Sequence, residues 1–207
     1  RKNLEKILDD PAVEISGMFI ALYNEEIKPN YIALDNKIED LYRIHMKGLM
    51  EYEEKSLYPD ANFTMRLTYG KINDYFPRDA VHYLHQTYLK GVMQKADPAI
   101  ADYKVRPKLI ELYEQKNYAP YGNDSLLPVC FIASNHTSGG NSGSPVLNAR
   151  GELVGINFDR NWEGTMSDLY YNADICRNIT VDIRYVLFII DKYAGASHLI
   201  KEMKLLR

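Results

Sequence analysis

The residues best suited to chemistry surround Ser142, in the segment Gly139-Gly140-Asn141-Ser142-Gly143-Ser144-Pro145-Val146. A small nucleophile between glycines suits acyl transfer, because glycine lets the backbone turn sharply and approach a substrate carbonyl. The N–H groups of Gly140 and Ser142 could then converge on the oxyanion that develops on that carbonyl. Taken alone, the tetrapeptide Gly-Asn-Ser-Gly fits equally a Gly- and Ser-rich loop between two strands.

Two apolar runs flank this segment and predict the strands that hold it. Residues 127–133 (LPVCFIA) precede it, and residues 152–158 (ELVGINF) follow it after a turn that ends at Gly151. Their β-branched and aromatic content is typical of strands. We therefore expect Ser142 in a loop that leads into a hairpin.

An unactivated serine is a poor nucleophile and needs a general base, which a third group orients. The chain has five histidines, namely His45, His82, His85, His136 and His198. His136 shares the loop of Ser142. His82 and His85 are three residues apart, but no nearby Cys, Asp or Glu cluster completes a metal site. We predict no metal and no cofactor.

Three segments together resemble the C-terminal part of the bacterial dipeptidyl-peptidase 7/11 family of serine peptidases. They are residues 134–145 (SNHTSGGNSGSP), 157–163 (NFDRNWE) and 178–188 (NITVDIRYVLF). The segment around Ser142 is also similar to the nucleophile segment of chymotrypsin-like peptidases. The resemblance is specific from about Asn62 onward and weaker before it. Arg160 points to the Asp/Glu-specific branch, dipeptidyl-peptidase 11, because relatives that prefer hydrophobic residues look to have Gly there.

The resemblance implies a role for each residue of the candidate site. Ser142 would form the acyl-enzyme, and the amides of Gly140 and Ser142 would form the oxyanion hole. Arg160 would hold a substrate carboxylate with two parallel hydrogen bonds. Asp159 would anchor the free α-amino group, and Phe158 would form an apolar wall. The expected partners are peptides with a free N-terminus and an acidic second residue. From the residues alone, Asp159 and Arg160 also fit a surface ion pair.

The resemblance also implies that this chain is a C-terminal fragment. The family's catalytic His and Asp lie in an N-terminal barrel that the chain does not contain, and His136 is not at the position of the base. We therefore expect the fragment alone to be inactive. The chain starts at Arg1 with no visible signal peptide, whereas the resemblance implies export to the periplasm or cell surface of a bacterium. The sequence leaves open whether the protein forms a homodimer.

Two other functions stay open at this stage. A Glu-specific endopeptidase with the same barrel would use the same Gly-Asn-Ser-Gly segment, but it would need no amine anchor. A non-enzymatic binding domain would keep a degenerate protease fold and lose the reaction. Blocking the N-terminus of the substrate separates a dipeptidyl peptidase from the first alternative. A covalent serine probe tests the second.

Composition and charge restrict the class of protein. The 207 residues are 46% hydrophobic and 26% charged, which is ordinary for a globular protein. A net charge of −3 gives no electrostatic reason to expect binding to nucleic acid or an anionic membrane. No apolar run reaches the ~18 residues of a membrane-spanning helix. Cys130 and Cys176 do not make a disulfide framework, and two free thiols are the favoured interpretation.

Residues 1–120 are predicted to be mostly helical and, by the resemblance, to form part of a cap domain. Asp10-Pro11 is a helix start signal, and Lys28-Pro29 is expected to break this helix. A second helix from about Asn30 to Tyr58-Pro59-Asp60 would then pack antiparallel to the first. Residues 62–70 alternate as in a strand. Further helices are predicted over residues 80–95 and 107–116.

Residues 121–207 are predicted to form the C-terminal barrel portion of the peptidase domain. Strands and loops extend to about Asp182, an amphipathic helix follows over Val181–Tyr193, and a short helix runs from Ser197 to Leu206. Trp162 is expected in the core, the commoner place for a lone Trp, or at the pocket rim. The predicted fold class is α+β: part of a helical cap domain, then the second β-barrel of a chymotrypsin-like double-barrel peptidase and a C-terminal helix.

Overall fold

The computed structural model describes residues 7–53, 64–123 and 125–206, and the chain divides into two compact units, Arg1–Asn62 and Phe63–Arg207. The change from helical to strand-like sequence that we predicted near residue 120 therefore falls inside the second unit. The reason is a shared core, because Leu89 and Leu112 pack in one cluster with Phe188. Within the described residues, no helix has the length and apolar character needed to cross a membrane.

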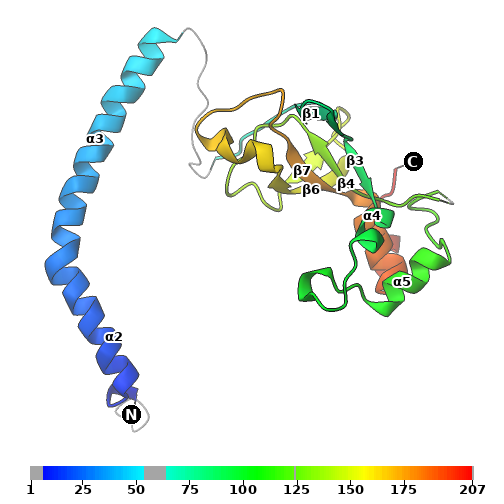
Figure 1. Cartoon of the computed structure of the whole chain (residues 1–207), viewed down its shortest axis with the longest axis horizontal. Coiled ribbons are helices and arrows are strands. Elements are labelled where there is room, and N and C mark those ends of the chain that lie inside the picture. Colours follow the sequence, from blue (N-terminus) through cyan, green and yellow to red (C-terminus); the bar gives the residue numbers. More distant parts are fainter. Residues whose placement is uncertain (1–6, 54–63, 124, 207) are drawn as a thin grey trace. The chain divides into compact units, whose positions relative to one another are not determined.

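The described part of the first unit is one long helical run (Figure 1). It comprises α2 (Pro11–Leu22), the π-helix η1 (Tyr23–Ile27) and α3 (Lys28–Tyr52). Asp10 caps the start through its carboxylate, which accepts a hydrogen bond from the N–H of Ala12 at 2.8 Å, as predicted.

The predicted break at Lys28-Pro29, and with it the antiparallel helical pair, is wrong. Proline removes a donor and crowds the preceding turn, but here the N–H of Lys28 donates to the carbonyl of Tyr23, which makes the turn one residue wider. This π-turn carries the helix past the proline. The predicted stop at residues 58–60 lies outside the described residues, and α3 already ends at Tyr52.

Two antiparallel sheets form the framework of the second unit. The smaller is a hairpin of two strands, and the larger has five strands in the order β3-β4-β7-β6-β5. The strands are β1 (Tyr75–Arg78), β2 (Val81–Tyr83), β3 (Gln86–Tyr88), β4 (Pro128–Ala133), β5 (Pro145–Leu147), β6 (Leu153–Arg160) and β7 (Asn178–Asp182).

The strands on both sides of Ser142 are confirmed, but two other predicted elements are wrong. Residues 64–70, the described part of the strand predicted over 62–70, belong to no strand. The helix predicted over 80–95 is instead β2, β3 and the short helix α4 (Leu89–Gln94). Val81, Tyr83 and Tyr88 supply the β-branched and aromatic side chains that favour strands, and the pairing of β3 with β4 outweighs the local helical pattern.

Helices cover one end of the large sheet and build the core there (Figure 1). Tyr118, Leu127 and Phe188 are almost fully buried in this core. The helix predicted over 107–116 is confirmed as α5, whereas the one predicted from Val181 begins only after β7. The helical elements at this end of the sheet are α4, the 3₁₀ helix η2 (Ala101–Tyr103), α5 (Pro107–Glu114), α6 (Ile183–Phe188), the π-helix η4 (Ile189–Tyr193) and α7 (Ser197–Lys201).

The α+β class is confirmed. In the part of the chain that the structure describes, the five strands form an open sheet and not a closed barrel, because edge strands β3 and β5 do not pair with each other. Strand β6 leads at the other end of the sheet into the 3₁₀ helix η3 (Trp162–Asp168). The loop of Ser142 joins β4 to β5.

Candidate functional site

Ser142 lies in an exposed turn between two glycines with left-handed backbone. Gly140 has φ of 95° and Gly143 has φ of 85°, values that favour glycine over residues with a Cβ. The hydroxyl of Ser142 donates to the carbonyl oxygen of Phe158 at 3.4 Å. The glycines that the sequence places around Ser142 are thus needed for the backbone conformation of the turn.

Asn157 of β6 fixes this turn to the sheet. Its backbone N–H donates to the carbonyl of Ser144 at 2.9 Å, and its own carbonyl accepts from the N–H of Gly143 at 2.8 Å. Its side-chain Nδ2 donates to the carbonyl of Asn141 at 3.2 Å. The N–H of Ser138 donates to the side-chain oxygen of Asn141 at 2.8 Å and closes the loop. Sequence reasoning missed Asn157, although a polar residue inside an apolar strand was a signal.

A buried chain of polar side chains continues beneath this turn. Nδ2 of Asn178 donates to Oδ1 of Asn157 at 3.0 Å and to the hydroxyl of Thr180 at 3.2 Å. All three residues are almost fully buried. Oδ1 of Asn178 is buried and has no hydrogen-bond partner among the described residues. These bonds hold β6 and β7 in a fixed relation behind the Ser142 turn.

A β-bulge at Phe158 sets the direction of the residues that follow it in β6. Asn157 pairs with Thr180 and Asp159 with Ile179, so Phe158 is an extra residue in the ladder. A bulge of this kind changes which face of the sheet the next side chains reach. Phe158 is 45% exposed and so stays available as an apolar surface.

Arg160 turns from the end of β6 toward the last turn of η3. Its Nη1 donates to Oδ1 of Asp168 at 2.7 Å and to the hydroxyl of Ser167 at 2.9 Å, while Nη2 donates to Oδ2 of Asp168 at 2.6 Å. The guanidinium lowers the pKa of the Asp168 carboxyl, chiefly through these hydrogen bonds. Sequence reasoning missed Ser167 and Asp168, because nothing local links them to β6.

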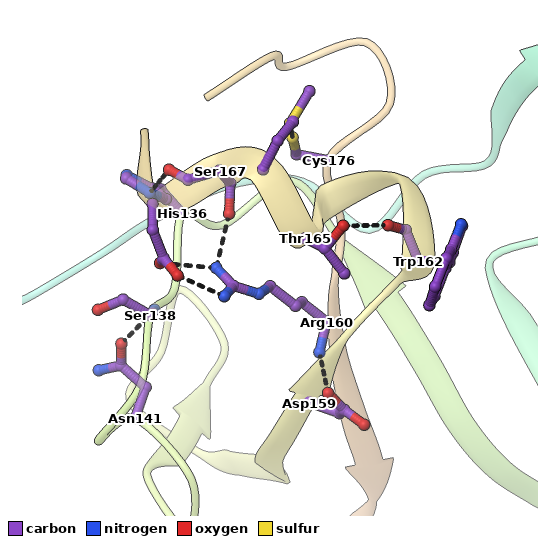
Figure 2. Close-up of polar contacts among 11 residues, drawn as sticks. His136, Ser138, Asn141, Asp159, Arg160, Trp162, Thr165, Ser167 and Cys176 are labelled. Carbon is purple, nitrogen blue, oxygen red and sulfur yellow. Dashed lines mark hydrogen bonds and ion pairs between the residues drawn. The ribbon is translucent and has the colours of Figure 1, made fainter. Parts of the chain in front are cut away.

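Asp159 takes no part in this cluster. Its carboxylate accepts a hydrogen bond from the backbone N–H of Arg160 at 2.8 Å, and Figure 2 shows it on the side of the strand end away from the Arg160 guanidinium. Asp159 is exposed. The surface Asp159–Arg160 ion pair that the sequence allowed is thus replaced by the pair of Arg160 with Asp168.

Asn161 fixes η3 against the sheet. Its Nδ2 donates to the carbonyl of Ile175 at 2.7 Å, and its Oδ1 accepts from the N–H of Arg177 at 2.8 Å. Asn161 is 7% exposed. Trp162, the next residue, is 84% exposed, so its expected place in the core is wrong. These bonds fix the start of η3 next to Arg160, and Ser167 and Asp168 lie at the other end of the same helix.

Three of the histidines, His82, His85 and His136, have hydrogen-bond partners among the described residues. His82 and His85 both contact Asp74, through Nε2 at 2.8 Å and Nδ1 at 2.7 Å respectively, and hydrogen bonds from His85 lower the pKa of Asp74. Nε2 of His136 lies 3.0 Å from the carbonyl oxygen of Ser167 (Figure 2). His136 therefore contacts the η3 side of the site.

A small space beside Arg160, without room for a water molecule, lies among these groups. Residues of the loop before Ser142, the end of β6, η3 and the start of β7 line it, namely Asn135, His136, Thr137, Arg160, Gly164, Ser167, Tyr171, Cys176, Arg177 and Asn178. A larger pocket of about 370 Å³ shares none of these residues and lies around Tyr121 and Arg184.

Cys130 and Cys176 are free thiols, as predicted. In the described parts of the chain, no group of three or more His, Cys, Asp or Glu is placed to hold a metal.

One family model and several known proteins match the sequence of this chain. A family model described as Peptidase S46 matches residues 1–205. The chain is 54% identical over 203 residues to an Asp/Glu-specific dipeptidyl-peptidase of Flavobacterium psychrophilum, covering 98% of this chain and 28% of that protein. It is 50% identical over 165 residues to dipeptidyl-peptidase 7 of Phocaeicola vulgatus, covering 79% of this chain and 23% of that protein.

Solved structures agree with this result. The crystal structure of Porphyromonas endodontalis DPP11 in complex with the dipeptide Arg-Asp matches with a TM-score of 0.87 and 46% identity, covering 96% of this chain and 29% of that chain. The complex of the same protein with Arg-Glu matches with a TM-score of 0.86. The present chain therefore spans less than a third of the length of these relatives.

Proposed function

The chain belongs to the peptidase S46 family, and from this premise we propose that it is the nucleophile-bearing part of a serine dipeptidyl peptidase. The full-length protein would release N-terminal dipeptides with Asp or Glu as the second residue. The observation that carries the proposal is Arg160, a guanidinium held at the end of β6 and packed against the loop that leads to Ser142. The names of the relatives, Asp/Glu-specific dipeptidyl-peptidases, support the same substrate class.

In the proposed reaction, the hydroxyl oxygen of Ser142 attacks the carbonyl carbon of the second residue of the peptide. Its hydroxyl proton passes to a base that the rest of the protein supplies, and the negative charge on the carbonyl oxygen is stabilised by the N–H groups of Gly140 and Ser142. The C–N bond breaks, the leaving amine takes the proton, and water then hydrolyses the acyl-enzyme. The present chain alone is expected to be inactive, because the family resemblance places the base outside it.

Substrate recognition would use the two ends of the dipeptide. The side-chain carboxylate of its second residue would bind Arg160 through two charge-assisted hydrogen bonds. Its free α-amino group would bind Asp159, whose exposed carboxylate faces away from the Arg160 guanidinium. Phe158, also exposed, would line the space between them. An anchor for the amine at a fixed distance from Ser142 would make the enzyme release two residues at a time.

The test is kcat/KM of the full-length protein on dipeptide reporters that end in Asp, Glu or Leu, each with a free and an acetylated N-terminus. We expect the acidic reporters with a free amine to be preferred and Ser142→Ala to abolish turnover. Arg160→Gly should cost the acidic reporters ~2–4 kcal/mol of transition-state stabilisation, the order expected for a bidentate charged contact.

Cleavage of acetylated reporters would favour a Glu-specific endopeptidase. No reaction with a covalent serine probe would favour a binding domain.

Location and assembly are part of the same proposal. We propose export to the periplasm or cell surface of a bacterium, as the family resemblance implies, and a homodimer is the assembly to be tested. Fractionation of cells that express the full-length protein tests the first point, and sedimentation of the purified protein tests the second.

A further inference from the structure

The carboxylate of Asp168 occupies the part of Arg160 that an acidic substrate would need. Both oxygens of Asp168 accept hydrogen bonds from the two terminal nitrogens of the guanidinium, at 2.7 and 2.6 Å. This is the parallel, bidentate arrangement by which arginine recognises a free carboxylate. Among the described residues, Ser167 is the other side-chain partner of the guanidinium.

Burial explains why Arg160 needs such a partner when no substrate is bound. The Arg160 side chain is 25% exposed, and a largely buried charge without a counter-charge is costly. Asp168 supplies the counter-charge from the last residue of η3. Anchoring of η3 by Asn161 keeps that carboxylate within reach of Arg160.

Asp168 is also the partner that can leave more easily. Its side chain is 51% exposed, about twice as much as that of Arg160. Among the described residues, its side-chain hydrogen bonds are those with Arg160, and the nearby His136 also lowers the pKa of its carboxyl through its charge. The next two residues, Leu169 and Tyr170, are exposed. Its carboxylate can therefore turn into water at small cost, whereas Arg160 stays packed between the loop of His136 and η3.

From this geometry we propose that Asp168 is a specificity-determining residue, an internal carboxylate that occupies Arg160 in the empty site and is displaced by the acidic side chain of a substrate. The inference rests on the proposed function of Arg160. Two carboxylates on one guanidinium edge repel each other, so the substrate carboxylate and Asp168 exclude one another. A neutral side chain cannot replace Asp168, so the pair stays closed with such a substrate, and Asp168 competes with acidic substrates alone.

The experiment compares Asp168→Asn and Asp168→Ala with wild type in the full-length protein, using free-amine reporters that end in Asp or Leu. We expect KM for the Asp reporter to fall roughly 2- to 5-fold, the size of an exposed ion pair, with kcat little changed. KM for the Leu reporter should not fall in the same proportion. Asp168→Glu, which keeps a carboxylate at this position, should stay close to wild type. Asp174→Asn is the matched control, because Asp174 is an exposed carboxylate in the same segment and its side chain has no hydrogen bond among the described residues.

Each result decides between alternatives. A rise in KM for the Asp reporter would mean that Asp168 positions Arg160 for the substrate, and an unchanged KM would mean that the pair is only a surface contact; either overturns the inference. An equal fall in KM for the Asp reporter in Asp174→Asn would show that the effect comes from the overall charge of the protein. This result would also overturn the inference. If wild type shows no preference for acidic reporters, the proposed function fails as well, so the wild-type comparison separates the two failures.

Discussion

Nδ2 of Asn157 donates a hydrogen bond to the carbonyl oxygen of Asn141, 3.2 Å away, and so joins strand β6 directly to the turn that carries Ser142. The other side-chain atom of Asn157, Oδ1, accepts from the buried Asn178 of β7. One amide thus connects the Ser142 turn to the strand pair β6–β7, in which β6 ends at Arg160. The two halves of the proposed site, reaction and recognition, share this connection.

Replacement of Asn157 by Ala should loosen the Ser142 turn without unfolding the sheet. The change removes two side-chain hydrogen bonds, each with a net value of about 1 kcal/mol, and leaves a buried donor of Asn178 with fewer partners. Hydrogen exchange of the amides between Gly140 and Ser144 should become faster, and kcat/KM of the full-length protein should fall. Asn117→Ala, at an exposed asparagine, is the control. Unchanged exchange in this turn would show that the backbone bonds alone hold it.

Gly140 and Gly139 form a matched pair for testing whether the left-handed backbone at Gly140 is needed for activity. A Cβ meets no atom within 4 Å at either position, but Gly140 has φ of 95°, a conformation that costs other residues about 1–2 kcal/mol. Gly140→Ala should therefore shift the backbone and move one proposed oxyanion donor, with a roughly 10- to 100-fold loss of kcat, below the loss for a deleted donor. Gly139→Ala should be close to wild type. Equal activity of the two variants would argue against a role for the Gly140 amide.

Gly155, at the centre of β6, should tolerate no side chain. A Cβ there would lie 2.4 Å from a methyl group of Thr180 and 2.5 Å from the carbonyl oxygen of Val181. Overpacking of this kind costs typically ~1–3 kcal/mol, so Gly155→Ala should lower the midpoint of thermal unfolding of the full-length protein. Gly91→Ala in α4, where a Cβ has open space, should not lower it. A similar midpoint for both variants would mean that β6 and β7 separate easily.

Local chemistry explains which parts of the fold could be predicted from the sequence. The Ser142 turn has its glycines where the backbone is left-handed, and the neighbouring strands show their composition over six to eight residues. The Asp10 cap is likewise a contact between residues two apart. In each case the decisive interactions lie within a few residues, so a sequence pattern can record them.

The errors arise where distant contacts decide the structure. β3 forms because it pairs with β4, more than 40 residues later in the chain, and nothing near Gln86 records that partner. The helical run continues through Pro29 without a break because the wider turn before it, which no sequence signal marks, satisfies the backbone hydrogen bonds. For the candidate site, Arg160 could be identified, but its contact with Asp168 depends on η3, which Asn161 anchors through Ile175 and Arg177. The roles of Ser142, Asp159 and Arg160 stay predictions until the kinetic tests are made.

The turn between β5 and β6 contains Glu152, whose contribution to the stability of the folded protein should depend on pH. Hydrogen bonds to the ionised carboxylate of Glu152, first from Arg150 and then from Asn148, lower its pKa from an ordinary 4.5 to about 2. A carboxyl group whose pKa is lower in the folded than in the unfolded protein stabilises the folded state above the unfolded value, here about pH 4.5. This stabilisation is lost as the pH falls from 4.5 toward 2.

Glu152→Gln removes that contribution at every pH. The midpoint of thermal unfolding of wild type should therefore exceed that of Glu152→Gln at pH 7, and the difference should shrink as the pH is lowered from 4.5 toward 2. Glu114→Gln at the end of α5 is the control, because Glu114 is exposed and forms no ion pair among the described residues. A difference that stays constant between pH 7 and pH 3 would mean that the shape of the Glu152 side chain, and not its charge, supports the hairpin behind Ser142.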